Sequence, residues 1–219
     1  MPPIFPPRSN VIARASLLVL PGLLAVVIGL LVWWVHSPAF NKVGVRIEQP
    51  VQFPHVTHVS VVGLNCRFCH ESVDKSSFAG LPPTQTCMGC HSFVKTESAL
   101  LAPVRAAWES GEPIQWNRVN NLPDYVFFNH AIHVNKGVGC DTCHGRMDTA
   151  LTAVKAETFY MAWCLDCHRE PEKFIRPLDQ VYNAAYKPTE DQKVLGARLV
   201  KEYNILPSNQ LMNCSICHR

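Results

Sequence analysis

The sequence predicts a mostly loop and short-helix domain with little sheet, tethered by a single N-terminal membrane helix. One observation is an uncharged apolar block near the start of the 219-residue chain. A second is that all ten cysteines fall into copies of one motif. The third is length, because residues 37–219 carry every copy and leave too little chain for a large conventional core.

The apolar block runs from Ala15 to Val35 and contains 21 residues without a charge. As a helix it spans roughly 31 Å, about the thickness of one hydrocarbon core. Trp33 and Trp34 lie at its end, where aromatic residues favour the membrane interface. The run is long for a cleaved signal peptide and no clear A-x-A site follows it, so we expect an uncleaved anchor.

The charges around this block predict its orientation. Arg8 and Arg14 precede it and no acidic residue does, which favours a cytoplasmic N-terminus. We therefore expect a single-pass protein of the cell inner membrane, with a cytoplasmic tail at residues 1–14, an anchor in the bilayer at 15–36, a linker at 37–52 and the remaining chain in the periplasm. The formal net charge of +3 is too small to indicate a nucleic-acid partner.

Every cysteine belongs to a C-x-x-C pair that a histidine follows directly, the signature of c-type haem attachment. Two thiols one helical turn apart can each form a thioether with a haem vinyl group, and the next residue then offers a proximal imidazole to the iron. Zinc ribbons do not require that histidine, a thioredoxin-like dithiol is expected once, and disulfides would leave the five histidines unexplained. Attachment outside the cytoplasm, as in bacteria, agrees with the expected orientation. The sequence thus predicts five haem c groups on Cys66, Cys69, Cys87, Cys90, Cys140, Cys143, Cys164, Cys167, Cys214 and Cys217, with the proximal ligands His70, His91, His144, His168 and His218.

A repeated Phe-x-His-x-x-His segment can fill the second axial position of most of these irons. It occurs as FPHVTHV from Phe53 and as FNHAIHV from Phe128. Histidines three apart on a helical turn point in similar but different directions, so one segment can reach two irons. The alternatives are ordinary surface histidines or a separate metal site. We predict four distal ligands, His55, His58, His130 and His133.

One iron then lacks a sixth ligand, and methionine is the other usual axial ligand of a low-spin haem. We favour Met161 and keep Met212 and His36 as alternatives. His36 lies just after Trp33 and Trp34 at the membrane surface, where we expect an interfacial residue. A ligand three residues before a C-x-x-C-H motif reaches a neighbouring haem more naturally than its own. We therefore assign Met161 to the haem at Cys214 and Cys217.

The repeat predicts two modules, residues 53–120 with two haems and residues 121–219 with three. The leading histidine precedes the first motif by 11 residues in one module and 10 in the other, and the second motif follows 21 and 24 residues later. Between the motifs we expect a short helix at Pro103–Ser110 that Gly111 stops. Another helix should begin with a capping box at Thr189–Gln192.

The paired-histidine segments followed by C-x-x-C-H motifs resemble those of class III multihaem cytochromes. The single anchor, the five motifs and the runs EPIQWNRVNNLPDYVFFNHAIH (Glu112–His133) and MAWCLDCHRE (Met161–Glu170) are similar to the pentahaem cytochrome c subunit of bacterial alternative complex III. This resemblance covers nearly all of residues 15–219.

The resemblance implies an electron-transfer subunit that is not itself an enzyme. It would relay electrons from menaquinol oxidation through five haems to a periplasmic acceptor or an oxidase. The implied partners are an iron–sulfur subunit, a polytopic quinol-binding subunit that carries out the quinol chemistry, and a monohaem cytochrome c. The alternative is an autonomous single-anchor multihaem quinol dehydrogenase that feeds a periplasmic reductase. A catalytic multihaem enzyme would need an open iron, sometimes with a C-x-x-C-K motif, which this sequence lacks.

Overall fold

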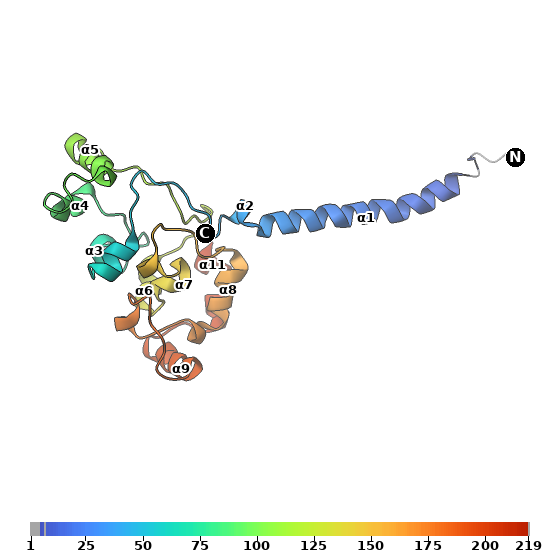
Figure 1. Cartoon of the computed structure of the whole chain (residues 1–219). Helices are drawn as coiled ribbons and strands as arrows, with labels where there is room; N and C mark the ends of the chain where they lie inside the picture. Colours follow the sequence, from blue (N-terminus) through green and yellow to red (C-terminus); the bar gives the residue numbers. More distant parts are fainter. Residues whose placement is uncertain (1–4, 7, 219) are drawn as a thin grey trace. The chain divides into compact units, whose positions relative to one another are not determined.

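The structure, a computed structural model, describes residues 5–6 and 8–218 (Figure 1). The chain divides into two compact units, Met1–Lys42 and Val43–Arg219. All five cysteine motifs lie in the second unit, which we call the haem unit. The further division of the haem unit into two modules remains a prediction.

The described part of the chain is built from helices, most of them short. In chain order they are α1 (Ser9–His36), α2 (Pro38–Asn41), the π-helix η1 (Thr57–Val61), α3 (Cys66–Cys69), α4 (Thr84–His91), η2 (Ala99–Leu101), α5 (Ala102–Ser110), α6 (His130–Asn135), α7 (Cys140–His144), η3 (Met147–Thr149), α8 (Met161–Arg169), η4 (Pro171–Lys173), η5 (Leu178–Gln180), α9 (Gln192–Glu202), α10 (Ser208–Leu211) and α11 (Cys214–Cys217).

Helix α1 contains the apolar block and has 28 residues. It is the one helix of the described residues that is long and apolar enough to cross a membrane. It begins at Ser9, so six more polar and apolar residues, Ser9 to Arg14, belong to the same helix before the block. It stops before the extended residue Ser37. Residues 1–4 and 7 of the expected cytoplasmic tail lie outside the described residues.

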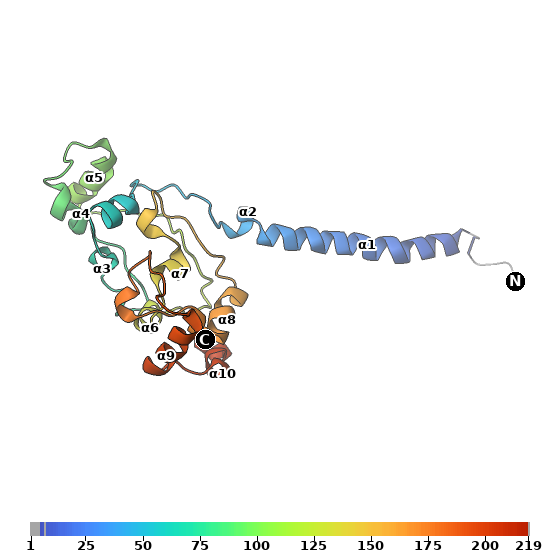
Figure 2. The same cartoon turned by 60° about the horizontal axis from the view of Figure 1, so that its bottom comes forward.

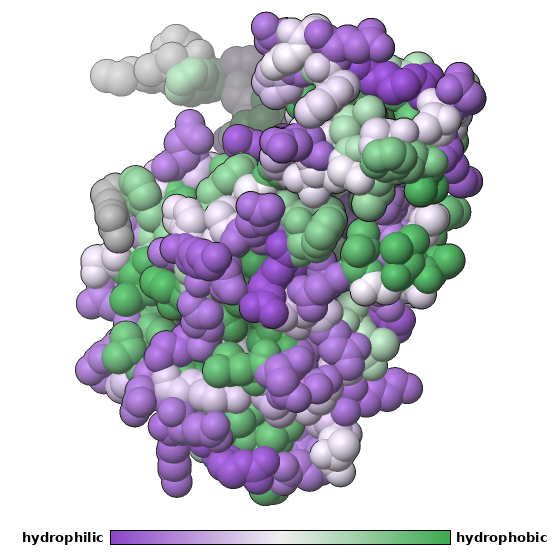
Figure 3. All heavy atoms as spheres, turned by 90° about the vertical axis from the view of Figure 1, so that its left-hand side faces the viewer, coloured by the Kyte–Doolittle hydropathy of each residue, from purple (hydrophilic) through white to green (hydrophobic). Residues whose placement is uncertain are grey.

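The haem unit has a small side-chain core, as the sequence predicts. Eight apolar side chains are buried among the described residues, and six of them form two separate clusters rather than one core. One cluster centres on Val73, Val134 and Val181, and the other on Ile175 and Leu195 with its neighbours on α9. On the face drawn in Figure 3, apolar side chains reach the surface between polar ones. Pairing of extended segments within the described residues is limited to isolated bridges.

Two predicted helices can be compared with the structure. Helix α5 ends at Ser110, and Gly111 follows in the left-handed conformation with φ +75°, as expected. The predicted capping box of α9 is wrong: its N-cap is Asp191 rather than Thr189. The Asp191 carboxylate accepts hydrogen bonds from the backbone N–H groups of Lys193 (2.9 Å) and Val194 (3.3 Å), so a nearer side chain satisfies the free donors of the first turn.

Helix α9 lies tightly against η4, which brings the second hydrophobic cluster together. Gly196 makes this approach possible, because a Cβ at this position would lie 1.9 Å from the backbone oxygen of Glu172. The turned view in Figure 2 shows α9 and α10 on the same side of the haem unit.

Candidate haem sites

Each C-x-x-C-H motif begins on or within a short helix, so its two thiols lie one turn apart. Two of these helices, α3 and α11, are capped by the asparagine before the first cysteine: Asn65 accepts from the N–H of Arg67, and Asn213 from that of Ser215. We number the sites in chain order. Site 1 is Cys66/Cys69/His70, site 2 is Cys87/Cys90/His91, site 3 is Cys140/Cys143/His144, site 4 is Cys164/Cys167/His168 and site 5 is Cys214/Cys217/His218.

The two Phe-x-His-x-x-His segments have the same side-chain geometry. The Phe53 ring meets His55 edge-on, with centroids 4.9 Å apart, and stacks on His58 at 4.2 Å. In the second segment the Phe128 ring meets His130 edge-on at 4.7 Å and stacks on His133 at 4.6 Å. The aromatic residue thus holds the two imidazoles of each segment in a fixed mutual orientation.

Three of these imidazoles face the proximal histidine of a site. The ring centroids are 6.2 Å apart for His58 and His91, 6.4 Å for His130 and His144, and 6.2 Å for His133 and His168, with interplanar angles of 67°, 4° and 31°. An iron between two imidazoles sits about 2 Å from each nitrogen and each ring centre lies about 1 Å beyond its nitrogen, so an axial pair has centroids roughly 6 Å apart. The three pairs therefore fit a six-coordinate iron of a haem.

The fourth imidazole of the segments, His55, lies in the neighbourhood of site 1. Burial, followed by the charges of His70 and His58, lowers the pKa of His55 to about 4. Its Nδ1 is buried and has no hydrogen-bond partner among the described residues. Since the second histidine of each segment faces the second site of its module and His130 faces site 3, the repeat relates His55 to site 1.

The second ring nitrogen of most of these histidines is tied to an acceptor, which sequence reasoning did not foresee. A proton on Nδ1 leaves the Nε2 lone pair free for a metal, and such second contacts also orient the ring. The second histidine of each segment uses the carbonyl four residues earlier: His58 contacts Pro54 O at 3.0 Å and His133 contacts Asn129 O at 2.8 Å. The further Nδ1-to-carbonyl contacts are His70 to Gly80 (2.8 Å), His91 to Val94 (3.0 Å), His130 to Ser77 (3.0 Å), His168 to Leu211 (2.9 Å) and His218 to Tyr125 (3.1 Å).

Burial keeps several of these imidazoles neutral. It is the main cause that lowers the pKa of His144 to about 4, and it also lowers the pKa values of His130 and His133. A neutral imidazole at pH 7 has a free lone pair, which is the form that binds iron. The environment thus favours ligation before any iron is considered.

The sixth ligand of site 5 is not indicated by an imidazole pair. Met161 is the first residue of α8 and is 61% exposed, and Met212 is 38% exposed. His36 is the last residue of α1, and its Nδ1 contacts Val32 O at 2.9 Å within that helix. The assignment of Met161 therefore remains a prediction.

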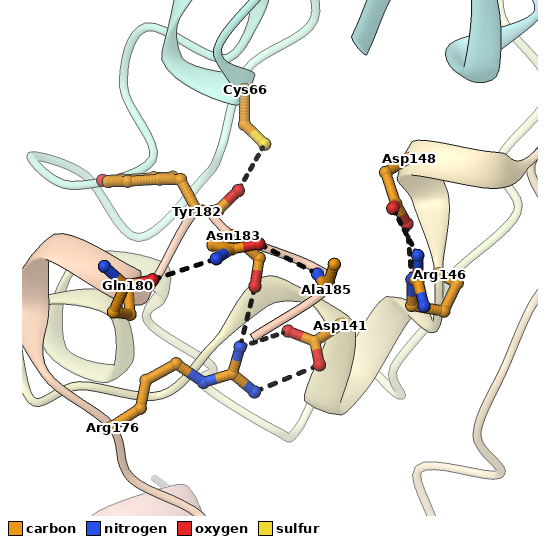
Figure 4. Close-up of polar contacts among 9 residues, drawn as sticks. All are labelled: Cys66, Asp141, Arg146, Asp148, Arg176, Gln180, Tyr182, Asn183 and Ala185. Carbon is orange, nitrogen blue, oxygen red and sulfur yellow. Dashed lines mark hydrogen bonds and ion pairs between the residues drawn. The ribbon is translucent and has the colours of Figure 1, made fainter. Parts of the chain in front are cut away.

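Sites 1 and 3 meet at their first cysteines. A hydrogen bond joins the thiols of Cys66 and Cys140, and it raises the pKa of Cys140 because this thiol keeps the shared proton. One short segment serves both sites. Cys66 Sγ donates to Tyr182 O at 3.9 Å (Figure 4). The N–H of Cys140 donates to Val181 O at 3.2 Å.

Cysteines of the other sites also lie near one another. Burial raises the pKa of Cys69, and the nearby charge of Cys87 raises it further, so sites 1 and 2 are neighbours. Burial likewise raises the pKa of Cys143 to about 12, with the charges of the two site 4 cysteines as the next causes. For Cys164, Cys217 of site 5 follows burial as a cause. The contact of His168 Nδ1 with Leu211 O at 2.9 Å, three residues before Cys214, also places site 4 beside site 5. These neighbours order the sites as the row 2–1–3–4–5.

A buried ion pair holds site 3. The guanidinium of Arg176 is bidentate to Asp141, with N–O distances of 2.8 and 3.1 Å, and also donates to Asn183 O at 3.1 Å (Figure 4). Asp141 lies between the two cysteines of site 3. The Arg176 side chain packs on Gly139, where an added Cβ would lie 2.2 Å from its Cζ.

Five short helices that present C-x-x-C-H, with imidazoles paired at the spacing of an iron, define a c-type cytochrome with several haems. The chain matches the family model for cytochrome c7 and related cytochrome c over residues 126–219. It is 31% identical, over an alignment of 157 residues, to the menaquinone reductase multihaem cytochrome c subunit of Nitratidesulfovibrio vulgaris. The match covers 62% of this chain and 73% of that protein. The chain therefore belongs to the multihaem cytochrome c family, and the predicted fold class is confirmed.

Proposed function

We propose that this chain is the electron-transfer subunit of a membrane quinol:acceptor oxidoreductase of the alternative complex III type. The observation that carries the proposal is the row of neighbouring sites 2–1–3–4–5. Haem c, when bound, supplies reversible one-electron chemistry at iron. An unbroken row of such sites has two ends, which suits entry of electrons at one end and exit at the other.

In this proposal the ten cysteines bind five haems covalently and the five following histidines are the proximal ligands. His58, His130 and His133 are the distal ligands of sites 2, 3 and 4, which the ring spacings of 6.2–6.4 Å support. His55 serves site 1 by the repeat, and Met161 serves site 5. With every axial position filled, no iron is left open for a substrate, so the chain itself is not an enzyme.

Quinone chemistry then belongs to a partner. We propose an iron–sulfur subunit, a polytopic quinol-binding subunit and a monohaem cytochrome c as partners, with α1 as an anchor that has its N-terminus in the cytoplasm and the haem unit in the periplasm. The name of the relative, a menaquinone reductase subunit, supports a role beside a quinone-reactive complex. The positive charges of Arg8 and Arg14 before the apolar block support the orientation.

A second candidate concerns the direction of electron flow. The relative's name describes reduction of menaquinone, so the same row of sites would carry electrons from a periplasmic donor to the quinone partner. The autonomous quinol dehydrogenase remains the other alternative, because a single anchor and several haems suit it equally.

The test starts from the complex purified from membranes in detergent. Mass spectrometry of this chain should show five covalent haems, and menaquinol should reduce all five in the complex. The paired change Cys140→Ala and Cys143→Ala should remove one haem and leave two of the remaining four unreduced, because it interrupts the row in its middle. The matched change Cys214→Ala and Cys217→Ala removes one haem at an end and should leave the other four connected.

Two outcomes would overturn the proposal, and a third would reverse the proposed direction of electron flow. Fewer than five haems on the native chain would remove its basis. Rapid menaquinol oxidation by the isolated subunit would favour the autonomous dehydrogenase. Faster menaquinone reduction by a reduced periplasmic cytochrome than the reverse reaction would favour the second direction.

A further inference from the structure

Site 3 differs from the other sites in what its proximal histidine contacts. The proximal histidines of sites 1, 2, 4 and 5 have Nδ1 next to a backbone carbonyl. Nδ1 of His144 instead lies 3.1 Å from the side-chain amide of Asn120. A backbone carbonyl cannot be removed by substitution, whereas this side-chain amide can.

The orientation of the Asn120 amide follows from its surroundings. Its Nδ2 faces Nδ1 of His144, while its Oδ1 is buried without a hydrogen-bond partner among the residues described. Nδ1 could accept from that amide only if the imidazole proton were on Nε2, and this tautomer cannot bind iron. A half turn of the amide places Oδ1 on the Nδ1–H and gives the buried oxygen the donor that it lacks.

The loop that carries Asn120 is held in place from outside the site. Asn117 Nδ2 donates to Glu48 O at 2.7 Å, its backbone N–H donates to Gln49 Oε1 at 3.0 Å, and Gln49 Nε2 donates to Asn117 O at 2.8 Å. These three hydrogen bonds span more than sixty positions of sequence. They fix the backbone three residues before Asn120, so its amide meets His144 without a large entropic cost.

The rings of site 3 also have a distinct arrangement. The ring planes of His130 and His144 are nearly parallel, with an interplanar angle of 4°. The paired rings at sites 2 and 4 are inclined by 67° and 31°. A hydrogen bond to Nδ1 restricts rotation of the His144 ring about its bond to a metal. Site 3 is the middle of the row 2–1–3–4–5, with two sites on either side.

We propose that Asn120 is a positioning residue that holds the His144 ring and sets its electron donation, and so tunes the central haem separately from the other four. The inference rests on the proposed function, because it requires a haem at site 3. An acceptor on Nδ1–H makes the imidazole a stronger donor to iron, which favours the oxidised state. Asn120→Leu removes the acceptor and Asn120→Asp replaces it with a stronger, charged one.

The experiment compares three variants of the full chain in its purified complex. We expect Asn120→Leu to raise one of the five midpoint potentials and Asn120→Asp to lower one. Each change should alter the reduced-to-oxidised ratio of that haem by about tenfold at a fixed applied potential, about 59 mV for one electron. Electron paramagnetic resonance should show one altered low-spin signal in Asn120→Leu, because the relaxed ring changes the angle to His130. The control is Asn121→Leu at the exposed neighbouring asparagine, whose Oδ1 accepts from Arg118, and it should move no potential.

The outcomes separate the inference from the proposed function. Five haems by mass with unchanged potentials in both Asn120 variants would overturn the inference alone. Shifts in the same direction for Leu and Asp would also overturn it, since they would indicate a general disturbance of the fold. If Asn120→Leu fails to mature with all haems, the direction of the Asn120→Asp shift decides. A wild-type chain with fewer than five haems would instead overturn the proposed function.

Discussion

Deleting the Asp141 carboxylate should destabilise the haem unit strongly. Its partner Arg176 is buried, with side-chain exposures of 9% for the arginine and 19% for the aspartate. Asp141→Ala removes both carboxylate acceptors and leaves the guanidinium with the single carbonyl of Asn183. A buried charge that loses its partner typically costs about 3–5 kcal/mol of stability. For a chain of this size we expect the Tm to fall by roughly 6–20 °C.

The assay is thermal unfolding of the full chain in detergent, followed by far-ultraviolet circular dichroism. The control is Asp166→Ala, an aspartate between the cysteines of site 4 that pairs with Arg169 at the surface, with side-chain exposures of 69% and 51%. It should cost no more than about 0.5 kcal/mol. Since the penalty comes from the unpaired charge, adding Arg176→Met to Asp141→Ala should recover part of the loss. Equal effects of Asp141→Ala and Asp166→Ala would refute the reasoning.

Two further predictions concern packing and the open ligand position. Gly196→Ala should destabilise the haem unit by roughly 1–3 kcal/mol in the same assay, because its new Cβ would overlap the backbone oxygen of Glu172; Gly29→Ala, whose Cβ meets nothing within 4 Å, should leave the melting of the haem unit unchanged. Met161→Leu should abolish a methionine-to-iron charge-transfer band in the optical spectrum of the oxidised protein, and Met212→Leu should retain it. Loss of the band in Met212→Leu but not in Met161→Leu would make Met212 the ligand.

The sequence was sufficient for the fold class and for the local structure of the motifs. A C-x-x-C-H motif places its cysteines one turn apart, and the structure has a short helix at each one. The limit of local reasoning appears at α9, where Thr189 fits a capping-box pattern but Asp191 lies nearer to the free N–H groups. Both residues are good caps, and only the backbone path decides between them.

The mutual arrangement of the sites could not be predicted from the sequence. Cys66 and Cys140 lie in different predicted modules, and their contact depends on the segment at Val181 and Tyr182, which comes after both. Nothing in the motif of site 3 points to Asn120, because the contact joins a distant loop to the last residue of α7 and forms only on folding. The sequence holds no signal for this contact. It is found only in the coordinates, where among the described residues Nδ1 of His144 contacts the Asn120 amide instead of a backbone carbonyl.

The meeting of sites 1 and 3 joins the two predicted modules at their first sites, so that their second sites lie away from this contact. Any addition at the carboxyl end then lengthens one arm only, as site 5 does beyond site 4, and the arm that ends in site 2 keeps its surroundings. A change at the carboxyl end of the chain therefore alters the contacts of one terminus of the array and leaves those of the opposite terminus as they are.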